Sequence, residues 1–157
     1  MTGRAREALF SILADRVPTA RVLDLYAGSG SLGLEALSRG AQSVVFVEND
    51  RRALVVLRQN VATIDLGGEV VEADVVRYLQ RATAIFDLVF VDPPYALSLA
   101  SVQEVLSELE PLLDADASVV VHRRAGENPP MGPGGLRLVG ERTYGDSRLW
   151  TYRKEET

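Results

Sequence analysis

The sequence predicts a three-layer α/β sandwich, with a mostly parallel sheet between helices and an antiparallel hairpin at its C-terminal edge. Short apolar runs alternate with stretches of helical period, which is typical of strands joined by crossover helices. A glycine-rich turn directly follows the first apolar run. Near the C-terminus, two strand-like runs flank a short turn. The 157 residues suit one compact domain, which we expect to cover residues 1–157.

Composition excludes several classes of protein. The chain contains no cysteine, which excludes a disulfide scaffold, a thiolate metal site and a cysteine nucleophile. The sequence holds no run of the roughly 20 apolar residues that a membrane helix needs, and charged Arg4 and Arg6 stand where a signal peptide would be apolar. We therefore expect a cytoplasmic protein without membrane or metal. The formal net charge of −5 is uneven, since residues 25–121 carry 6 basic and 14 acidic side chains.

The first helix and the first strand follow from the N-terminal pattern. Residues 4–14 place apolar side chains on one stripe at helical spacing, and Val17-Pro18 ends this helix. Residues 21–25 are a short apolar run and form the first predicted strand. The glycine-rich turn then leads into a helix through residues 32–37, which Gly40 stops.

The middle of the chain continues this alternation. Residues 44–47 are apolar throughout, as expected for a strand covered on both faces. Asp50 can cap the next helix. The predicted buried side of that helix consists of Ala53, Val56, Leu57, Asn60, Val61 and Ile64. Gly67-Gly68 turns the chain into a strand over residues 69–72, and a short helix over residues 75–81 follows.

The last third contains two further strands and the hairpin. Residues 86–91 are an apolar run, and Ser101 is predicted to open a helix whose apolar positions extend to Leu113. Residues 117–121 form the fifth strand, and the proline- and glycine-rich residues 128–135 form a loop. The hairpin has two predicted strands and a turn between them, at residues 136–143, 148–153 and 144–147.

The glycine-rich turn is the most informative motif. Gly28, Gly30 and Gly33 have the G-x-G-x-x-G spacing, which allows a tight turn, close approach of a ligand to the backbone and close helix packing. Glu48 stands twenty residues past Gly28, at the end of the second strand, where a carboxylate can accept hydrogen bonds from both hydroxyls of a ribose. The motif predicts a cofactor that contains a nucleoside, with Asn49 among its contacts.

Two acidic residues favour S-adenosylmethionine over a dinucleotide. Asp24 lies four residues before Gly28, where a carboxylate suits a cationic amino group, whereas a pyrophosphate prefers positive potential. Asp74 follows the third strand and can accept a hydrogen bond from an adenine amino group, with Val75 against the ring. Asp74 could instead be an ordinary helix cap. Tyr26 could shield the methionine part of the cofactor or only pack.

The tetrapeptide Asp92-Pro93-Pro94-Tyr95, directly after the fourth strand, predicts methylation of an exocyclic amine. The lone pair of such an amine is delocalised into the base, and acceptors aimed at its two N–H bonds make the nitrogen more nucleophilic. The Asp92 carboxylate and the Pro93 carbonyl can be those acceptors, while the two prolines keep the backbone rigid. Tyr95 can stack on the base, and Asp92 or solvent can take the released proton. These four residues are the predicted catalytic group.

These motifs together resemble the RsmD family of bacterial 16S rRNA guanine-N2 methyltransferases. The resemblance rests on DLYAGSGSLGLEALSRGA, VVFVEND, FDLVFVDPPY and TYGDSRLWTY, and covers nearly the whole chain. It implies a class I (Rossmann-like) S-adenosylmethionine-dependent methyltransferase fold, with S-adenosyl-L-methionine as donor and S-adenosyl-L-homocysteine as product. It also implies 16S rRNA, within the 30S subunit or its assembly intermediate, as the partner. The family usually carries a basic arm before the segment that begins at Arg4, so we expect the arm to be missing here and RNA binding to be weak.

The resemblance also implies a role for each predicted site residue. Asp24, Gly28, Gly30 and Glu48 would hold the methionine part and the ribose. Asp74 would contact the adenine, and residues 92–95 would grip the guanine.

Other functions stay open on the sequence alone. Methylation of adenine N6 in DNA or RNA uses the same tetrapeptide but calls for a target-recognition insert, for which this length leaves no room. A protein-glutamine methyltransferase would be expected to carry Asn in place of Asp92, and a nicotinamide-dependent oxidoreductase has no use for the tetrapeptide. A non-catalytic cofactor-binding domain is the remaining class. We interpret His122, the only histidine, as structural, and Arg123 and Arg124 as candidates for contact with RNA phosphate.

Overall fold

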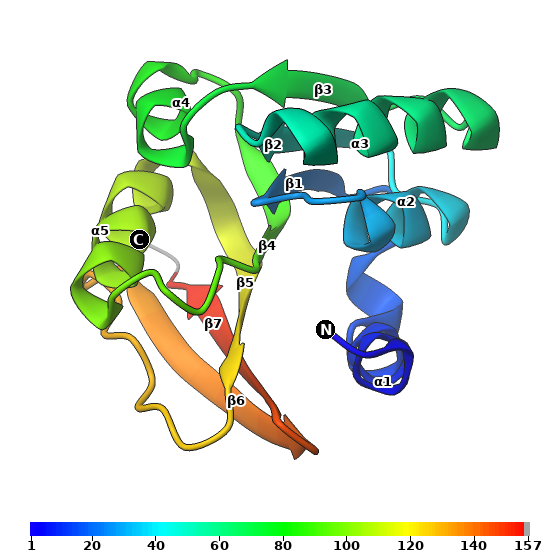
Figure 1. Cartoon of the computed structure of the whole chain (residues 1–157). Coiled ribbons are helices and arrows are strands. Elements are labelled where there is room, and N and C mark those ends of the chain that lie inside the picture. The colour runs from blue at the N-terminus through cyan, green and yellow to red at the C-terminus, as the bar shows by residue number, and fades with distance from the viewer. Residues whose placement is uncertain (156–157) are drawn as a thin grey trace.

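The computed structural model describes residues 1–155, which form one sheet with helices on both faces (Figure 1). The strands are β1 (Arg21–Leu25), β2 (Ser43–Glu48), β3 (Glu69–Glu72), β4 (Phe86–Val91), β5 (Leu113–Arg124), β6 (Leu136–Tyr144) and β7 (Ser147–Lys154). The α-helices are α1 (Gly3–Ile12), α2 (Ser31–Ser38), α3 (Arg51–Ile64), α4 (Val75–Arg81) and α5 (Leu99–Leu109). Two short 3₁₀ turns, η1 (Ala14–Arg16) and η2 (Glu110–Leu112), complete the fold.

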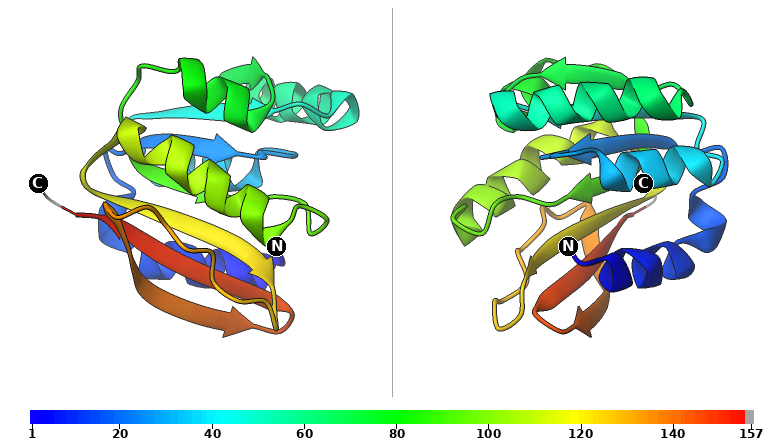
Figure 2. Two further views of the ribbon diagram at one scale, coloured as in Figure 1. Left: turned by 90° about the vertical axis from the view of Figure 1, so that its left-hand side faces the viewer. Right: turned by 45° about the vertical axis from the view of Figure 1, so that its right-hand side comes forward.

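The sheet has the strand order β3-β2-β1-β4-β5-β7-β6. The strands β1 to β5 are parallel, and β7 runs antiparallel between β5 and β6 (Figure 2). The chain first builds outward from β1 to β3 and then returns to place β4 on the other side of β1. Open α/β sheets bind ligands at the carboxyl ends of the strands beside such a reversal. The predicted fold class is confirmed, and the segments that follow β1, β2 and β4 meet at one edge.

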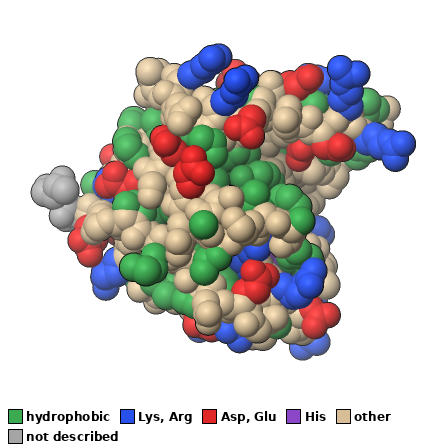
Figure 3. All heavy atoms as spheres, turned by 60° about the vertical axis from the view of Figure 1, so that its left-hand side comes forward, with side chains coloured by type: hydrophobic (Ala, Val, Ile, Leu, Met, Phe, Trp, Pro, Cys, Tyr) green, Lys and Arg blue, Asp and Glu red, His purple; other side chains and the backbone are tan. Residues whose placement is uncertain are grey.

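Alternate residues of the strands face two different helical layers. Val89 and Val121 belong to the core that the sheet shares with α4 and α5. Phe90 and Val120 belong to the core on the other face, which also contains buried residues of α1, α2 and α3. Figure 3 shows the side of the molecule that carries α4 and α5, where acidic and apolar side chains lie in the middle and Lys and Arg side chains lie towards the rim.

The buried side of α3 differs from the prediction. Leu54 and Leu57 are its buried residues, whereas Val56 and Ile64 are each 44% exposed. The helix therefore contacts the sheet through a narrow strip. Because apolar residues stand on both sides of that strip, Val55 among them, periodicity alone could not select the right face.

The boundaries of α5 and β5 also differ from the prediction. The cap of α5 is Ser98, whose side chain accepts a hydrogen bond from the Ser101 N–H, so Ser101 lies inside the first turn. The helix ends before Pro111, which cannot continue a helical hydrogen-bond ladder, and Leu113 already begins β5. The strand is longer than residues 117–121 because β4 pairs with it from Leu113 to Val121 and β7 pairs with it from Ser118 to Arg124.

The third glycine of the turn lets α2 pack closely on the sheet. A Cβ at Gly33 would overlap the Phe46 ring and lie 2.8 Å from Val44 Cγ1. We therefore expect Gly33→Ala to lower the free energy of unfolding by about 1–3 kcal/mol, as overpacking does in other cores. Chemical denaturation measures this change. Gly3→Ala is the matched control, because Gly3 is helical and has open space around it, and this variant is expected to gain roughly 0.5–1 kcal/mol. Unchanged stability of Gly33→Ala would contradict the prediction.

Candidate active site

The turn between β1 and α2 has the backbone that its glycines permit. The φ angle is 59° at Gly28 and 86° at Gly30, both in the left-handed region that glycine adopts without strain. Tyr26 has a φ of 59° as well, although it is not a glycine. Such a backbone costs on the order of 1–3 kcal/mol and tends to occur at functional sites. The turn thus holds its N–H groups at the carboxyl edge of the sheet in a conformation that the flanking elements impose.

Three carboxylates lie near one another at this edge, from β1, β2 and the segment after β4. Asp24 is only 1% exposed, and burial raises its pKa well above its usual value. The Gly33 N–H donates to Asp24 Oδ2 at 3.0 Å and opposes this shift, whereas the negative charges of Asp92 and Glu48 add to it. A cation near these groups would relieve their mutual repulsion and favour the ionised form of Asp24. The electrostatics of the edge therefore suit a positively charged ligand.

The Glu48 carboxylate joins the glycine turn to the start of α3. Its Oε1 accepts a hydrogen bond from the Gly28 N–H at 2.8 Å. Its Oε2 accepts from the N–H groups of Asn49 and Asp50, at 2.9 and 2.8 Å. Asp50 in turn caps α3 through the Ala53 N–H, as predicted. A carboxylate offers about four acceptor positions, so Glu48 keeps capacity for a ligand hydroxyl.

Asp74 lies after β3 and caps α4, since its Oδ2 accepts from the Arg77 N–H at 3.1 Å. The sequence was compatible with two roles for Asp74, and the structure shows one of them, the helix cap. The contact with an adenine stays a prediction. Asn49 and Asp74 line one cavity of about 560 Å³, and Val75 is buried in the first turn of α4. The structure thus brings these predicted cofactor residues together beside Glu48.

Tyr26 packs on the face of the sheet that α4 and α5 cover. Burial raises the pKa of its hydroxyl to about 12, and the charges of Asp74 and Glu104 act in the same direction. The packing role of Tyr26 is therefore observed. Its role as a shield for a methionine group stays a prediction.

Asp92 contacts a buried histidine across two parallel strands. Val91 of β4 pairs with Val121 of β5, which makes Asp92 and His122 neighbours. Asp92 Oδ1 lies 2.7 Å from His122 Nδ1, and His122 Nε2 lies 2.9 Å from Ser147 Oγ. His122 is only 2% exposed. Sequence reasoning missed this contact; the one signal for it was that Asp92 and His122 each directly follow the apolar run of a predicted strand.

The backbone after the tetrapeptide is held by Arg123. Its guanidinium donates to the carbonyl oxygens of Pro94 at 3.1 Å and Leu97 at 2.7 Å, and it pairs with Glu127 at 3.0 Å. Because Arg123 is 3% exposed, the interpretation that it reaches RNA phosphate is wrong. Its role is to fix the loop that carries Tyr95, together with Pro93, which is buried.

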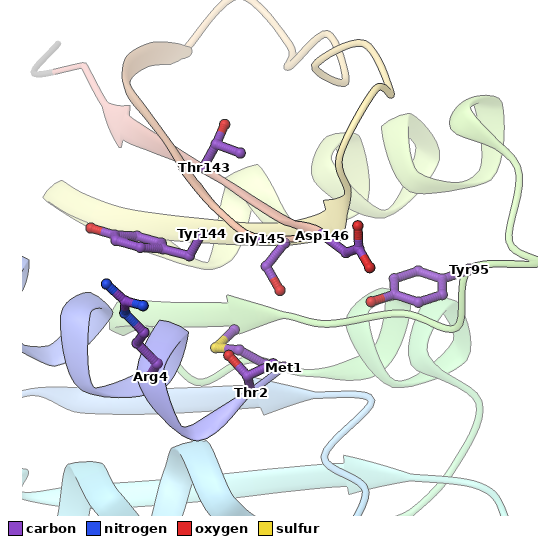
Figure 4. A pocket seen from close by; sticks show the side chains of 9 residues that line it. Met1, Thr2, Arg4, Tyr95, Thr143, Tyr144, Gly145 and Asp146 are labelled. Atoms are coloured by element: carbon purple, nitrogen blue, oxygen red, sulfur yellow. The ribbon is translucent and has the colours of Figure 1, made fainter.

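A cavity of about 810 Å³ opens beside Tyr95 (Figure 4). It lies between the start of α1, with Arg4, and the β6–β7 turn, with Tyr144. The guanidinium of Arg124 lies over the Tyr95 ring, 4.4 Å from its centroid, so one face of this 44% exposed ring is already covered. Ser147, the partner of His122, also lines the cavity. The volume is in the range of ligand pockets, and the lining combines aromatic, polar and basic groups.

Within residues 1–155, every helix is too short or too polar to cross a membrane. The same part of the chain contains no group of three or more His, Asp or Glu side chains arranged to hold a metal ion.

Known proteins resemble this chain over nearly its whole length. The family model described as Conserved hypothetical protein 95 matches residues 1–153. Ribosomal RNA small subunit methyltransferase D of Escherichia coli (strain K12) is 35% identical over 155 residues, which cover 98% of this chain and 78% of that protein. The solved structure of yhhF from Escherichia coli has a TM-score of 0.91 at 34% identity and covers 99% of this chain and 89% of that chain. SMU.776, solved in complex with SAH, shares the fold at a TM-score of 0.76 and 12% identity, over 94% and 49% of the two chains.

Proposed function

The chain belongs to the RsmD family, whose model is described as Conserved hypothetical protein 95. Members of this family are S-adenosylmethionine-dependent methyltransferases, and we propose a function for this chain from that premise. The proposed reaction transfers a methyl group from S-adenosylmethionine to the exocyclic N2 amine of a guanine in 16S rRNA. Ribosomal RNA of the small subunit is the substrate named for the Escherichia coli relative. The proposal includes guanine as the target base and the 30S subunit or its assembly intermediate as the substrate particle. It also includes a cytoplasmic location and a single methyltransferase domain over residues 1–157.

The observation that carries the proposal is the position of Asp92 beside the acidic edge. Leu25 of β1 pairs with Val91 of β4, so Asp92 and the β1 turn leave the sheet at the same edge, which supports a common reaction centre. The negative charge of Asp92, which adds to the raised pKa of Asp24, agrees with this placement. A sulfonium bound over β1 and β2 would therefore lie next to an amine held after β4. A dinucleotide would bring its pyrophosphate to the same carboxylates, which disfavours the oxidoreductase alternative.

The cofactor residues fit the donor by charge and by hydrogen-bonding capacity. Asp24 would attract the ammonium of the methionine part, and Glu48 would accept from the ribose hydroxyls. Asp74 would accept from the adenine amino group, with Asn49 and Val75 beside the ring. When bound, the donor supplies an electrophilic methyl group attached to a positively charged sulfur.

The tetrapeptide would prepare the amine for attack. Asp92 and the Pro93 carbonyl accept from the two N–H bonds, which directs the nitrogen lone pair out of the base. An amine held in this way would be ready to take the methyl group that the donor, once bound beside Asp24 and Glu48, would supply while keeping the C–S electron pair on its sulfur. The surplus proton leaves the nitrogen for Asp92 or water. Because Arg124 covers one face of Tyr95, the base would stack on the other face, in the cavity of about 810 Å³ that Tyr95 lines.

A substrate panel tests the proposal. Radiolabelled S-adenosylmethionine is offered to unmethylated 30S particles, naked 16S rRNA and duplex DNA, and the labelled nucleoside is identified by mass spectrometry. We expect label in ribosomal RNA as N2-methylguanosine. Label in N6-methyladenosine would favour the adenine alternative. Cofactor binding by calorimetry without label in any substrate would favour the non-catalytic alternative, and binding of NAD alone would overturn the methyltransferase assignment.

A further inference from the structure

A chain of hydrogen bonds runs from the proposed reaction centre into the sheet. It links Asp92 Oδ1 to His122 Nδ1 at 2.7 Å and His122 Nε2 to Ser147 Oγ at 2.9 Å. We propose that His122 is a positioning residue for Asp92: its Nδ1–H holds one carboxylate oxygen so that the other faces the amine, and the Ser147 hydroxyl donates to the Nε2 that this tautomer leaves as an acceptor. This inference rests on the proposed function.

The direction of each hydrogen bond follows from the groups involved. An ionised carboxylate only accepts, so the contact with Asp92 requires a proton on His122 Nδ1. In a neutral imidazole the other nitrogen is then an acceptor. The Ser147 hydroxyl must therefore donate to Nε2. The carboxylate thus fixes the tautomer, and the serine hydroxyl holds the ring from its other side, in the way that outer partners orient the ligands of metal sites.

The strands hold this arrangement in place. His122 lies in β5, with β4 on one side and β7 on the other, where it pairs with Leu149. Ser147 is two residues from Leu149 along β7 and therefore points to the same face of the sheet as His122. Both side chains are nearly fully buried, at 2% and 4% exposure. The imidazole is thus fixed by the sheet, whereas the side chain of Asp92 stands at a strand end and is 28% exposed.

A fixed carboxylate matters for this reaction because the amine is a poor nucleophile. With one acceptor position of Oδ1 taken by His122, Oδ2 is the oxygen that has both electron pairs free for an N–H bond of the amine. An amine bonded there has one defined direction for its lone pair. A misplacement of about 1 Å in such a geometry can cost on the order of 10²-fold in rate. His122 would therefore act on turnover and leave the distant cofactor contacts unaffected.

The first test reads the tautomer directly. His122 is the only histidine of the chain, so a protein without a histidine tag gives a single set of imidazole nitrogen signals by NMR. We expect the neutral imidazole to carry its proton on Nδ1 and none on Nε2. In Ser147→Ala the contact with Asp92 should keep the proton on Nδ1, whereas in Asp92→Ala a substantial fraction of the Nε2–H form is expected. A proton on Nε2 and a bare Nδ1 in the wild-type protein would overturn the proposal.

The second test separates positioning from packing. An asparagine at position 122 places its amide nitrogen near the place of Nδ1, whereas a glutamine reaches towards the place of Nε2. We expect His122→Ala and His122→Gln to lower kcat on 30S particles by about 10–100-fold, the usual effect of such outer contacts, with unchanged affinity for S-adenosylmethionine. His122→Asn should restore most of the rate. Equal rates for His122→Asn and His122→Ala would overturn the proposal.

The controls separate this inference from the proposed function. Calorimetry with S-adenosylmethionine and thermal denaturation show whether each variant folds. If a variant does not fold, the tautomer measured in the wild-type protein still tests the proposal. A wild-type protein that binds the donor and methylates no RNA refutes the proposed function. An active wild-type protein whose rate is the same in His122→Ala refutes the positioning role alone.

Discussion

Replacement of Asp92 by alanine is expected to lower methyl transfer to 30S particles by about 10²–10³-fold. The magnitude is that of losing one preorganised group aimed at the charge that develops in a transition state. Asp92 is the residue of the tetrapeptide that has a charged side chain. Its carboxylate is held in one orientation because His122 Nδ1 lies 2.7 Å from one of its oxygens. Affinity for S-adenosylmethionine should change far less, since the contacts proposed for the donor come from β1, β2 and the residues that follow the first three strands. Single-turnover rates and calorimetry measure the two effects separately.

The control for this variant is Asp92→Asn. Its amide oxygen can still accept from the amine, but the charge is gone and the amide nitrogen can no longer serve as an acceptor for His122. We expect a smaller loss of rate than in Asp92→Ala. In Asp92→Ala the Nδ1–H of buried His122 also loses its partner, which costs about 1–3 kcal/mol of stability, so thermal denaturation must accompany the kinetics. Wild-type turnover, or a loss of cofactor affinity as large as the loss of rate, would contradict the role of Asp92.

The elements that sequence patterns predict well are those whose surroundings are simplest. Strands β1, β3 and β4 have the predicted boundaries, because each is a short hydrophobic run between clear turn signals. Helix α3 shows the limit of this reasoning. Its buried residue Leu54 stands beside exposed Val55 and Val56, and only the narrow contact with the sheet decides which of the three is covered.

The candidate site divides in a similar way. Glu48 and Asp92 could be predicted because each ends or follows an apolar run of the parallel sheet, and such ends meet at one edge. Asp24 could be predicted because it stands four residues before Gly28. The roles of His122 and Arg123 could not. They depend on the register of β5 against β4 and β7, which joins segments far apart in the sequence. A lone histidine or arginine after a strand carries no sign of which partner the register will bring to it.

Replacement of Glu48 by alanine is expected to weaken the binding of S-adenosylmethionine by about 1.5–3 kcal/mol, or roughly 10–150-fold in Kd. Two losses contribute. The ribose hydroxyls lose their acceptor, and the N–H groups of Gly28, Asn49 and Asp50 lose the carboxylate that holds the turn and the start of α3 together. Calorimetry measures the change. Asp50→Ala is the matched control, because it removes a neighbouring carboxylate that caps α3 and is expected to cost about 1 kcal/mol of stability with little change in affinity.

A ligand without ribose hydroxyls separates the two losses. The analogue of S-adenosylhomocysteine that lacks both the 2′- and 3′-hydroxyl groups cannot donate to Glu48, so its affinity should already be reduced for the wild-type protein. If the direct contact dominates, Glu48→Ala should weaken this analogue much less than it weakens S-adenosylhomocysteine, and the difference is the coupling energy of the pair. If the turn dominates, both ligands should lose affinity equally, because the disordered backbone penalises each of them. Affinity for S-adenosylhomocysteine that is unchanged in Glu48→Ala would remove this residue from the site, and with it the argument that the end of β2 selects a nucleoside.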